Sequence, residues 1–81
     1  MIVDVRSSEE YAGGHIEGSI NIPIGDLTLR FSELEHYKNI PVITCCASGM
    51  RSVRAKSILK SNGFEQVHNG GSWSSLQRNL K

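Results

Sequence analysis

The sequence predicts an α/β domain in which a central, mainly parallel sheet is flanked by helices. Three observations favour this class. Short apolar runs alternate along the chain with segments whose apolar residues recur at helical spacing. The run at residues 41–45 (PVITC) is a continuous apolar stretch opened by proline, as is typical of a central parallel strand that is covered on both faces. The chain has 81 residues, which is too few for two domains, so we expect residues 1–81 to form one.

The chain opens with the apolar run IVDV at residues 2–5, which predicts a short buried strand. A helical turn should follow. Ser7 or Ser8 can cap its start, acidic residues occupy its first turn, and Gly13 with Gly14 ends it.

Residues 18–24 (GSINIPI) predict a second extended segment, and Pro23 favours a sheet edge or a strand end. A helix is expected from Asp26, which can cap it. Three apolar residues follow at helical spacing: Leu27, Phe31 and Leu34.

The strand at residues 41–45 leads into a predicted helix over residues 51–64, which Asn62 and Gly63 would end. Four of its residues are expected to face the sheet: Val53, Ala55, Ile58 and Leu59. Residues 65–71 predict a last short strand that ends in a glycine turn, and residues 72–80 predict a final helical turn.

Composition and charge exclude several classes of partner. The net charge of +1 gives no overall field that would attract nucleic acid or a membrane, so anion binding must be local. No apolar run is long enough to span a bilayer, and a charge at Asp4 argues against a secretory signal. The two cysteines are adjacent and make no disulfide framework. We therefore expect a cytoplasmic protein with both thiols free.

The segment that follows the central strand has the features of an anion cradle. Cys46 falls at the carboxyl end of this strand, which is the edge of an open parallel sheet where ligands bind. Ala47, Ser48 and Gly49 are small, and Gly49 can adopt a positive φ that turns successive N–H groups inward. The start of a helix and the guanidinium of Arg51 add positive potential.

These surroundings favour a thiolate at Cys46, and the thiolate is the nucleophilic form of cysteine. The competing interpretation, a small buried and inert residue, is less favoured for Cys46. It is preferred for Cys45, because side chains alternate along a strand and Cys45 should point to the opposite face as core packing.

Three segments together resemble the rhodanese family of sulfurtransferases, over nearly the whole chain. Residues 2–23 (IVDVRSSEEYAGGHIEGSINIP) are similar to the opening of the family, and residues 46–52 (CASGMRS) to its active-site loop, Cys-x-x-Gly-x-Arg-Ser. Residues 63–73 (GFEQVHNGGSW) resemble its closing strand and glycine turn. One such motif would be a weak signal, but three in the same order and spacing are a strong one.

The resemblance implies a rhodanese-like fold and a persulfide relay without a metal or organic cofactor. Cys46 would be the catalytic nucleophile. It would take a sulfane sulfur from a small anionic donor such as thiosulfate and pass it to a thiophilic acceptor, such as a protein thiol. The substrate-binding residues would be those of the loop: Ala47, Ser48, Gly49, Met50, Arg51 and Ser52.

Other matching positions carry lesser roles. We expect Asp4 and Arg6 to form an ion pair that fixes loops. His15 is interpreted as a structural residue, since attack by a thiolate on sulfane sulfur needs no base. His36 and His68 show no metal-ligand spacing. A further residue, Trp73, is expected to pack beside the sheet.

The chain departs from the family pattern in two ways. It begins at the Asp-Val-Arg motif, where the family usually has an extra strand and helix first, so the sheet is predicted to lack an edge strand and to leave an edge that pairs with a partner. Cys45 is also a residue that the loop pattern does not require.

Two alternative functions stay open at this point. Counted from Cys45, the loop reads Cys-x5-Arg, the spacing of phosphatases and arsenate reductases, although Gly49 then sits one position late. The other alternative is a non-catalytic rhodanese-like module that docks proteins or senses redox state.

Overall fold

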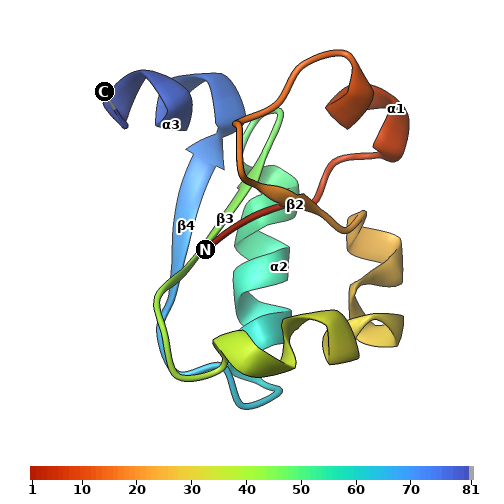
Figure 1. The fold of residues 1–81 in the computed structure, drawn as a ribbon, viewed down its shortest axis with the longest axis vertical. Coiled ribbons are helices and arrows are strands. Elements are labelled where there is room, and N and C mark those ends of the chain that lie inside the picture. The colour runs from red at the N-terminus through yellow and green to blue at the C-terminus, as the bar shows by residue number, and fades with distance from the viewer. Residues whose placement is uncertain (81) are drawn as a thin grey trace.

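The computed structural model describes residues 1–80 and contains a four-stranded parallel sheet with the strand order β2-β1-β3-β4 (Figure 1). The strands are β1 (Ile2–Asp4), β2 (Ile20–Asn21), β3 (Val42–Cys46) and β4 (Val67–Ser72). This arrangement confirms the predicted α/β class with a parallel sheet. β3 lies inside the sheet, as its continuous apolar sequence indicated, and β2, just before Pro23, lies at an edge.

Three α-helices connect and cover these strands: α1 (Ser8–Ala12), α2 (Met50–Lys60) and α3 (Trp73–Asn79). Ser7 is the N-cap of α1, and its side chain accepts a hydrogen bond from the Glu10 N–H while the Glu10 carboxylate accepts one from the Ser7 N–H. This reciprocal pair is a capping box. α1 and α3 lie at the end of the sheet toward which β4 points, the carboxyl edge of the strands (Figure 1).

The helix predicted from Asp26 is wrong in type. Residues Ile24–Leu29 and Phe31–Tyr37 instead form two 3₁₀ helices, η1 and η2, which meet at Arg30. Asp26 lies inside η1 and caps nothing, because no side chain caps either helix. The apolar spacing still identified the inward positions: Leu27 and Leu34 are fully buried, and Phe31 packs against the core. Tertiary packing of these side chains holds the turns in place.

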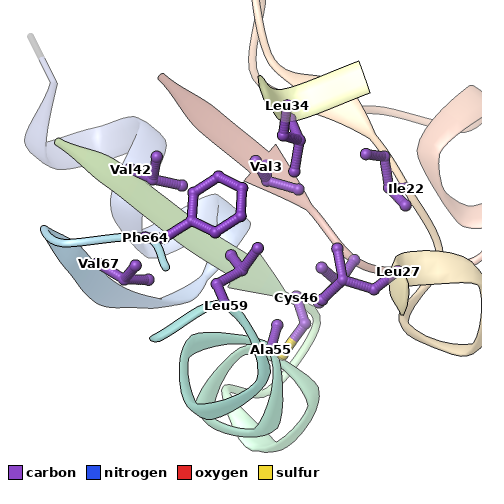
Figure 2. Packing of buried hydrophobic residues seen from close by; sticks show 11 residues of the cluster. Val3, Ile22, Leu27, Leu34, Val42, Cys46, Ala55, Leu59, Phe64 and Val67 are labelled. Atoms are coloured by element: carbon purple, nitrogen blue, oxygen red, sulfur yellow. The ribbon is translucent and has the colours of Figure 1, made fainter. Parts of the chain in front are cut away.

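The core lies between the sheet and α2 (Figure 2). Val42 and Cys46, two alternate residues of β3, point to this side, and Ala55 and Leu59 of α2 pack against them. The expectation that Val53 also faces the sheet is wrong, since 53% of its surface is exposed. The buried stripe of α2 runs through Ser52, Ala55 and Leu59, and Val53 lies about 100° around the helix from Ser52.

Candidate active site

Cys46 is the last residue of β3, and the loop that follows it leads directly into α2. Gly49 is the N-cap of α2 and has φ 97° and ψ −14°, a left-handed conformation that favours glycine. The positive φ expected from the sequence is thus present. It reverses the chain so that the first N–H groups of α2 turn back toward the end of the strand.

Two backbone N–H groups donate hydrogen bonds to the Cys46 sulfur. The Gly49 nitrogen lies 2.9 Å from Sγ, and the Ser52 nitrogen lies 3.3 Å from it. Cys46 itself is fully buried beneath this loop. The sulfur therefore sits in a cradle of peptide dipoles and is shielded from bulk water.

The cradle changes the acidity of the thiol. Burial alone would raise the pKa of Cys46, but hydrogen bonds from the Ser52 side chain and from the Ser52, Gly49 and Ser48 backbone outweigh burial and lower this pKa. The site thus favours the thiolate, the form of cysteine that attacks electrophilic sulfur.

Arg51 forms an ion pair with Glu10. Its Nη1 and Nη2 atoms donate to the two carboxylate oxygens of Glu10, at 2.7 and 3.0 Å. This ion pair lowers the pKa of Glu10 to about 2, chiefly through the hydrogen bonds from Arg51. The positive charge of Arg51, which was expected to add to the anion cradle, is therefore balanced by the Glu10 carboxylate.

A second set of contacts joins the loop to β4. The Ser52 hydroxyl lies 2.6 Å from Asn69 Oδ1 and 3.0 Å from the Gly49 carbonyl, and Asn69 Oδ1 also accepts a hydrogen bond from the Gly71 N–H at 2.9 Å. Because a hydroxyl has one proton, these two acceptors compete for it with the sulfur of Cys46. Asn69 therefore holds Ser52 and the start of α2 against β4.

Cys45 has the opposite environment. It is fully buried and is absent from the core cluster that contains Cys46. It is paired in register with Asp4 of β1, and burial together with this nearby carboxylate raises its pKa to about 12. The N–H groups of the loop point to the sulfur of Cys46, so the Cys-x5-Arg register of phosphatases has no cradle around Cys45.

Asp4 and Arg6 form the predicted ion pair, and it is buried. Arg6 Nη2 lies 2.8 Å from Asp4 Oδ2, and Arg6 also donates to the carbonyl oxygens of Glu10 and Gly14. Trp73 packs on the pair, with its ring centroid 4.8 Å from the Arg6 guanidinium carbon. The pair thus fixes the segment around α1, which in turn presents Glu10 to Arg51.

His15 has the contacts of a structural residue. Its Nδ1 lies 2.7 Å from the Tyr11 carbonyl oxygen, and its ring stacks on Tyr11 with centroids 3.7 Å apart. Within residues 1–80, no three side chains of His, Cys, Asp or Glu come together as a metal-binding group. In the same residues, no helix is long and apolar enough to cross a membrane.

The structure brings some of the expected loop residues to the sulfur and leaves others at the surface. Gly49 and Ser52 donate hydrogen bonds to Cys46, and the Ser48 backbone also lowers its pKa although Ser48 is exposed. Ala47 and Met50 are exposed as well. Sequence reasoning missed two residues that organise the loop, Glu10 and Asn69. The Ser-x-x-Glu spacing of a capping box was visible at Glu10, but its contact with Arg51 across 41 residues was not. No sequence signal marked Asn69.

Comparison with known proteins assigns this geometry to a family. Residues 1–78 match the rhodanese-like domain. Among curated proteins, the thiosulfate sulfurtransferase PspE of Escherichia coli K12 is 38% identical over 69 residues, which are 85% of this chain and 66% of PspE. The putative sulfur carrier protein YrkF of Bacillus subtilis is 43% identical over 68 residues, 84% of this chain and 36% of YrkF.

An uncharacterized Bacillus subtilis protein, YqhL, is 40% identical over 69 residues, 85% of this chain; the chain thus spans about half (53%) of the length of YqhL.

Two solved structures have the same fold. A rhodanese with anions from Escherichia coli superposes with a TM-score of 0.84 at 35% identity, covering 91% of this chain and 87% of that one. The human single-domain sulfurtransferase TSTD1 gives 0.79 at 26% identity, covering 95% and 80%.

Proposed function

Because the chain belongs to the rhodanese-like domain family, we propose that it is a sulfurtransferase in which Cys46 carries a sulfane sulfur as a persulfide. The observation that carries the proposal is the pair of hydrogen bonds from the Gly49 and Ser52 N–H groups to the Cys46 sulfur. They stabilise negative charge on this sulfur, and a persulfide formed there keeps the same charge.

The reaction has two steps that conserve charge. The Cys46 thiolate attacks the outer sulfur of thiosulfate, the S–S bond of the donor breaks, and sulfite leaves with the bonding electron pair. The persulfide anion of Cys46 then gives its outer sulfur to an acceptor thiolate, which becomes a persulfide while the Cys46 thiolate is restored. No proton transfer is needed at the sulfur in either step.

The loop residues Ala47 to Ser52 would bind the transferred sulfur mainly through their peptide N–H groups. Arg51 has a reduced role compared with the sequence expectation, because Glu10 balances its charge. A guanidinium has five N–H groups, so Arg51 retains donors for a substrate oxygen even with both Nη atoms bonded to Glu10. The site should therefore recognise a sulfane donor by shape and hydrogen bonding more than by net charge.

Access to the thiol depends on the loop. Cys46 is fully buried, whereas Ala47 and Ser48 above it are small and exposed. A donor therefore reaches the sulfur when these two residues move aside. This arrangement favours a narrow donor such as thiosulfate or an extended persulfide over a bulky one.

The test is an intact-mass measurement after incubation with thiosulfate. We expect a gain of one sulfur atom that cyanide removes as thiocyanate, in the wild type and in Cys45→Ser but not in Cys46→Ser. Persulfidation of Cys46→Ser would show that the nucleophile is misassigned. A wild type that gains no sulfur from thiosulfate or from a small-molecule persulfide would favour the non-catalytic docking or redox-sensing module.

A further inference from the structure

The outer face of α2 carries two exposed apolar side chains among polar and basic ones. Met50 is 77% exposed and Val53 is 53% exposed, although both are large apolar residues. They line a hollow together with Arg51 and Arg54. Val53 also lines the next hollow along the helix, so the two hollows form one continuous surface that starts beside the active-site loop.

The same face carries positive charge that the chain does not neutralise. α2 contains four basic residues and no acidic one. Arg51 is paired with Glu10, whereas Arg54, Lys56 and Lys60 make no ion pair within residues 1–80. We define the α2 face by the residues that combine these properties: Met50, Val53, Arg54, Lys56, Ser57 and Lys60.

The position of the α2 face relates it to the chemistry. Met50 is the first residue of α2, and the N–H of the preceding Gly49 contacts the Cys46 sulfur. A partner that covers Met50 and Val53 therefore lies next to the loop that holds the thiol. Such a partner can hold its own thiol at the loop while the rest of its surface contacts the helix.

The mixture of charge and apolar surface identifies the kind of partner. Exposed Met and Arg are enriched at protein interfaces, and unpaired cations select an acidic surface. A nucleic acid would use the cations but gain little from covering Met50 and Val53. A second copy of this chain is a weaker match, because four of its eight carboxylates are already in ion pairs and its net charge of +1 adds no overall attraction to this basic face.

We propose that the α2 face is the docking surface for an acidic acceptor protein, which places a cysteine flanked by carboxylates and an apolar side chain against the Cys46 loop. This inference rests on the proposed sulfur transfer and names the class of acceptor. The carboxylates pair with Arg54, Lys56 and Lys60, and the apolar side chain covers Val53.

The test uses a synthetic peptide with one cysteine among glutamates and leucines, and a matched peptide in which glutamine replaces glutamate. Protein loaded with sulfur from thiosulfate is mixed with each peptide, and transfer is followed by mass. We expect the acidic peptide to accept sulfur about tenfold faster than its neutral match at low salt, with the difference shrinking as salt rises.

The double variant Arg54→Glu/Lys60→Glu should abolish this preference. Val53→Ser should slow transfer to both peptides, because both carry the leucines that would cover Val53. Turnover of thiosulfate with cyanide should stay unchanged in both, since these residues lie outside the loop. Arg78→Glu, a charge reversal on exposed α3, is the matched control and should retain the preference for the acidic peptide. If the double variant preferred the acidic peptide over its neutral match as strongly as the wild type does, the proposal would be overturned.

Binding is also measured separately with serine in place of the peptide cysteine, so that it does not depend on sulfur transfer. A wild type that takes up no sulfur yet binds the acidic serine peptide through the α2 face would refute the proposed function and leave the docking surface in place. Tighter binding of a uridine oligonucleotide than of the peptide, lost in the double variant, would assign the face to nucleic acid instead. Self-association that the double variant removes would assign it to a second copy.

Discussion

The carboxylate of Glu10 binds the guanidinium of Arg51 through two hydrogen bonds of 2.7 and 3.0 Å, although 41 residues separate them in the chain. Glu10 comes from α1, after β1, and Arg51 from the first turn of α2, after β3. The contact joins α1 to α2 at the loop that holds Cys46. The cation beside the candidate nucleophile is therefore neutralised before any substrate arrives.

Removing the charge of Glu10 should improve the use of anionic donors. In Glu10→Gln the amide can keep the capping box with Ser7, but Arg51 regains its full positive charge. We expect KM for thiosulfate, a dianion, to fall about threefold, as is typical for releasing a partly exposed charge. Steady-state kinetics at low and high salt measure the change, which should shrink with salt.

Glu9→Gln is the matched control. Glu9 lies on the same turn of α1 and is exposed, and it makes no ion pair within residues 1–80. This variant loses the same formal charge without touching Arg51, so its KM should equal that of the wild type. An equal decrease in both variants would show that net charge, and not the contact with Arg51, sets donor affinity.

Much of the site could be predicted from the sequence because its geometry is local. The loop from Cys46 to Ser52 is one continuous segment, and the need for a positive φ at Gly49 follows from the residues themselves. The contacts of Arg51 with Glu10 and of Ser52 with Asn69 join different elements. A single sequence does not reveal such pairings, so the ion pair of Arg51 with Glu10 could not be predicted, and the role of Arg51 in substrate binding stays a prediction.

The two cysteines should differ sharply in their response to pH. The loop hydrogen bonds lower the pKa of Cys46, so its alkylation by iodoacetamide should rise with pH at a lower midpoint than in the urea-unfolded protein. Burial raises the pKa of Cys45 to about 12, so Cys46→Ser should remain unmodified at neutral pH. Rapid alkylation of Cys46→Ser at neutral pH would contradict the assignment of Cys45 to the interior.

Gly49 should be required for the thiolate as well as for stability. Alanine at φ 97° is strained, which costs about 1–2 kcal/mol of folding free energy. Relaxation of this strain moves the residue 49 N–H away from Sγ, so Gly49→Ala should also raise the pKa of the thiol and slow sulfur uptake. Urea titration measures the first effect, and alkylation against pH measures the second.

Gly18→Ala separates these two effects. Gly18 has φ 86° and open space around its Cα, so alanine should cause a similar loss of stability there. Gly18 is far from the loop in sequence and makes no hydrogen bond to Cys46, so the pKa of the thiol should not move. If Gly18→Ala raised this pKa as much as Gly49→Ala does, general destabilisation would explain both results.

The elements of the fold were predictable to different degrees for physical reasons. The continuous apolar sequence of β3 located that strand to within one residue. The helix after it was also predicted, but α2 ends at Lys60, before the stop expected at Asn62 and Gly63. Residues 24–37 carry apolar side chains at helical spacing, but they fold as two 3₁₀ helices because packing of Leu27 and Leu34 on the core sets their path. Their periodicity predicted which residues point inward and not the type of helix.

The buried ion pair of Asp4 and Arg6 should contribute far more to folding than an exposed pair. Asp4 accepts hydrogen bonds from the Arg6 backbone N–H and from its Nε and Nη2 atoms, and both side chains are at most 5% exposed. Asp4→Asn would leave a buried guanidinium without a counter-charge, so we expect a loss of about 3–5 kcal/mol in the free energy of unfolding. For a domain of this size that is a large share of the total, about 4–12 kcal/mol. Urea denaturation followed by far-ultraviolet circular dichroism measures the loss.

Glu33→Gln, which breaks the exposed Arg30–Glu33 pair, is the control and should leave the urea midpoint unchanged. A midpoint for Asp4→Asn equal to that of Glu33→Gln would mean that the segment around α1 is held by its other contacts.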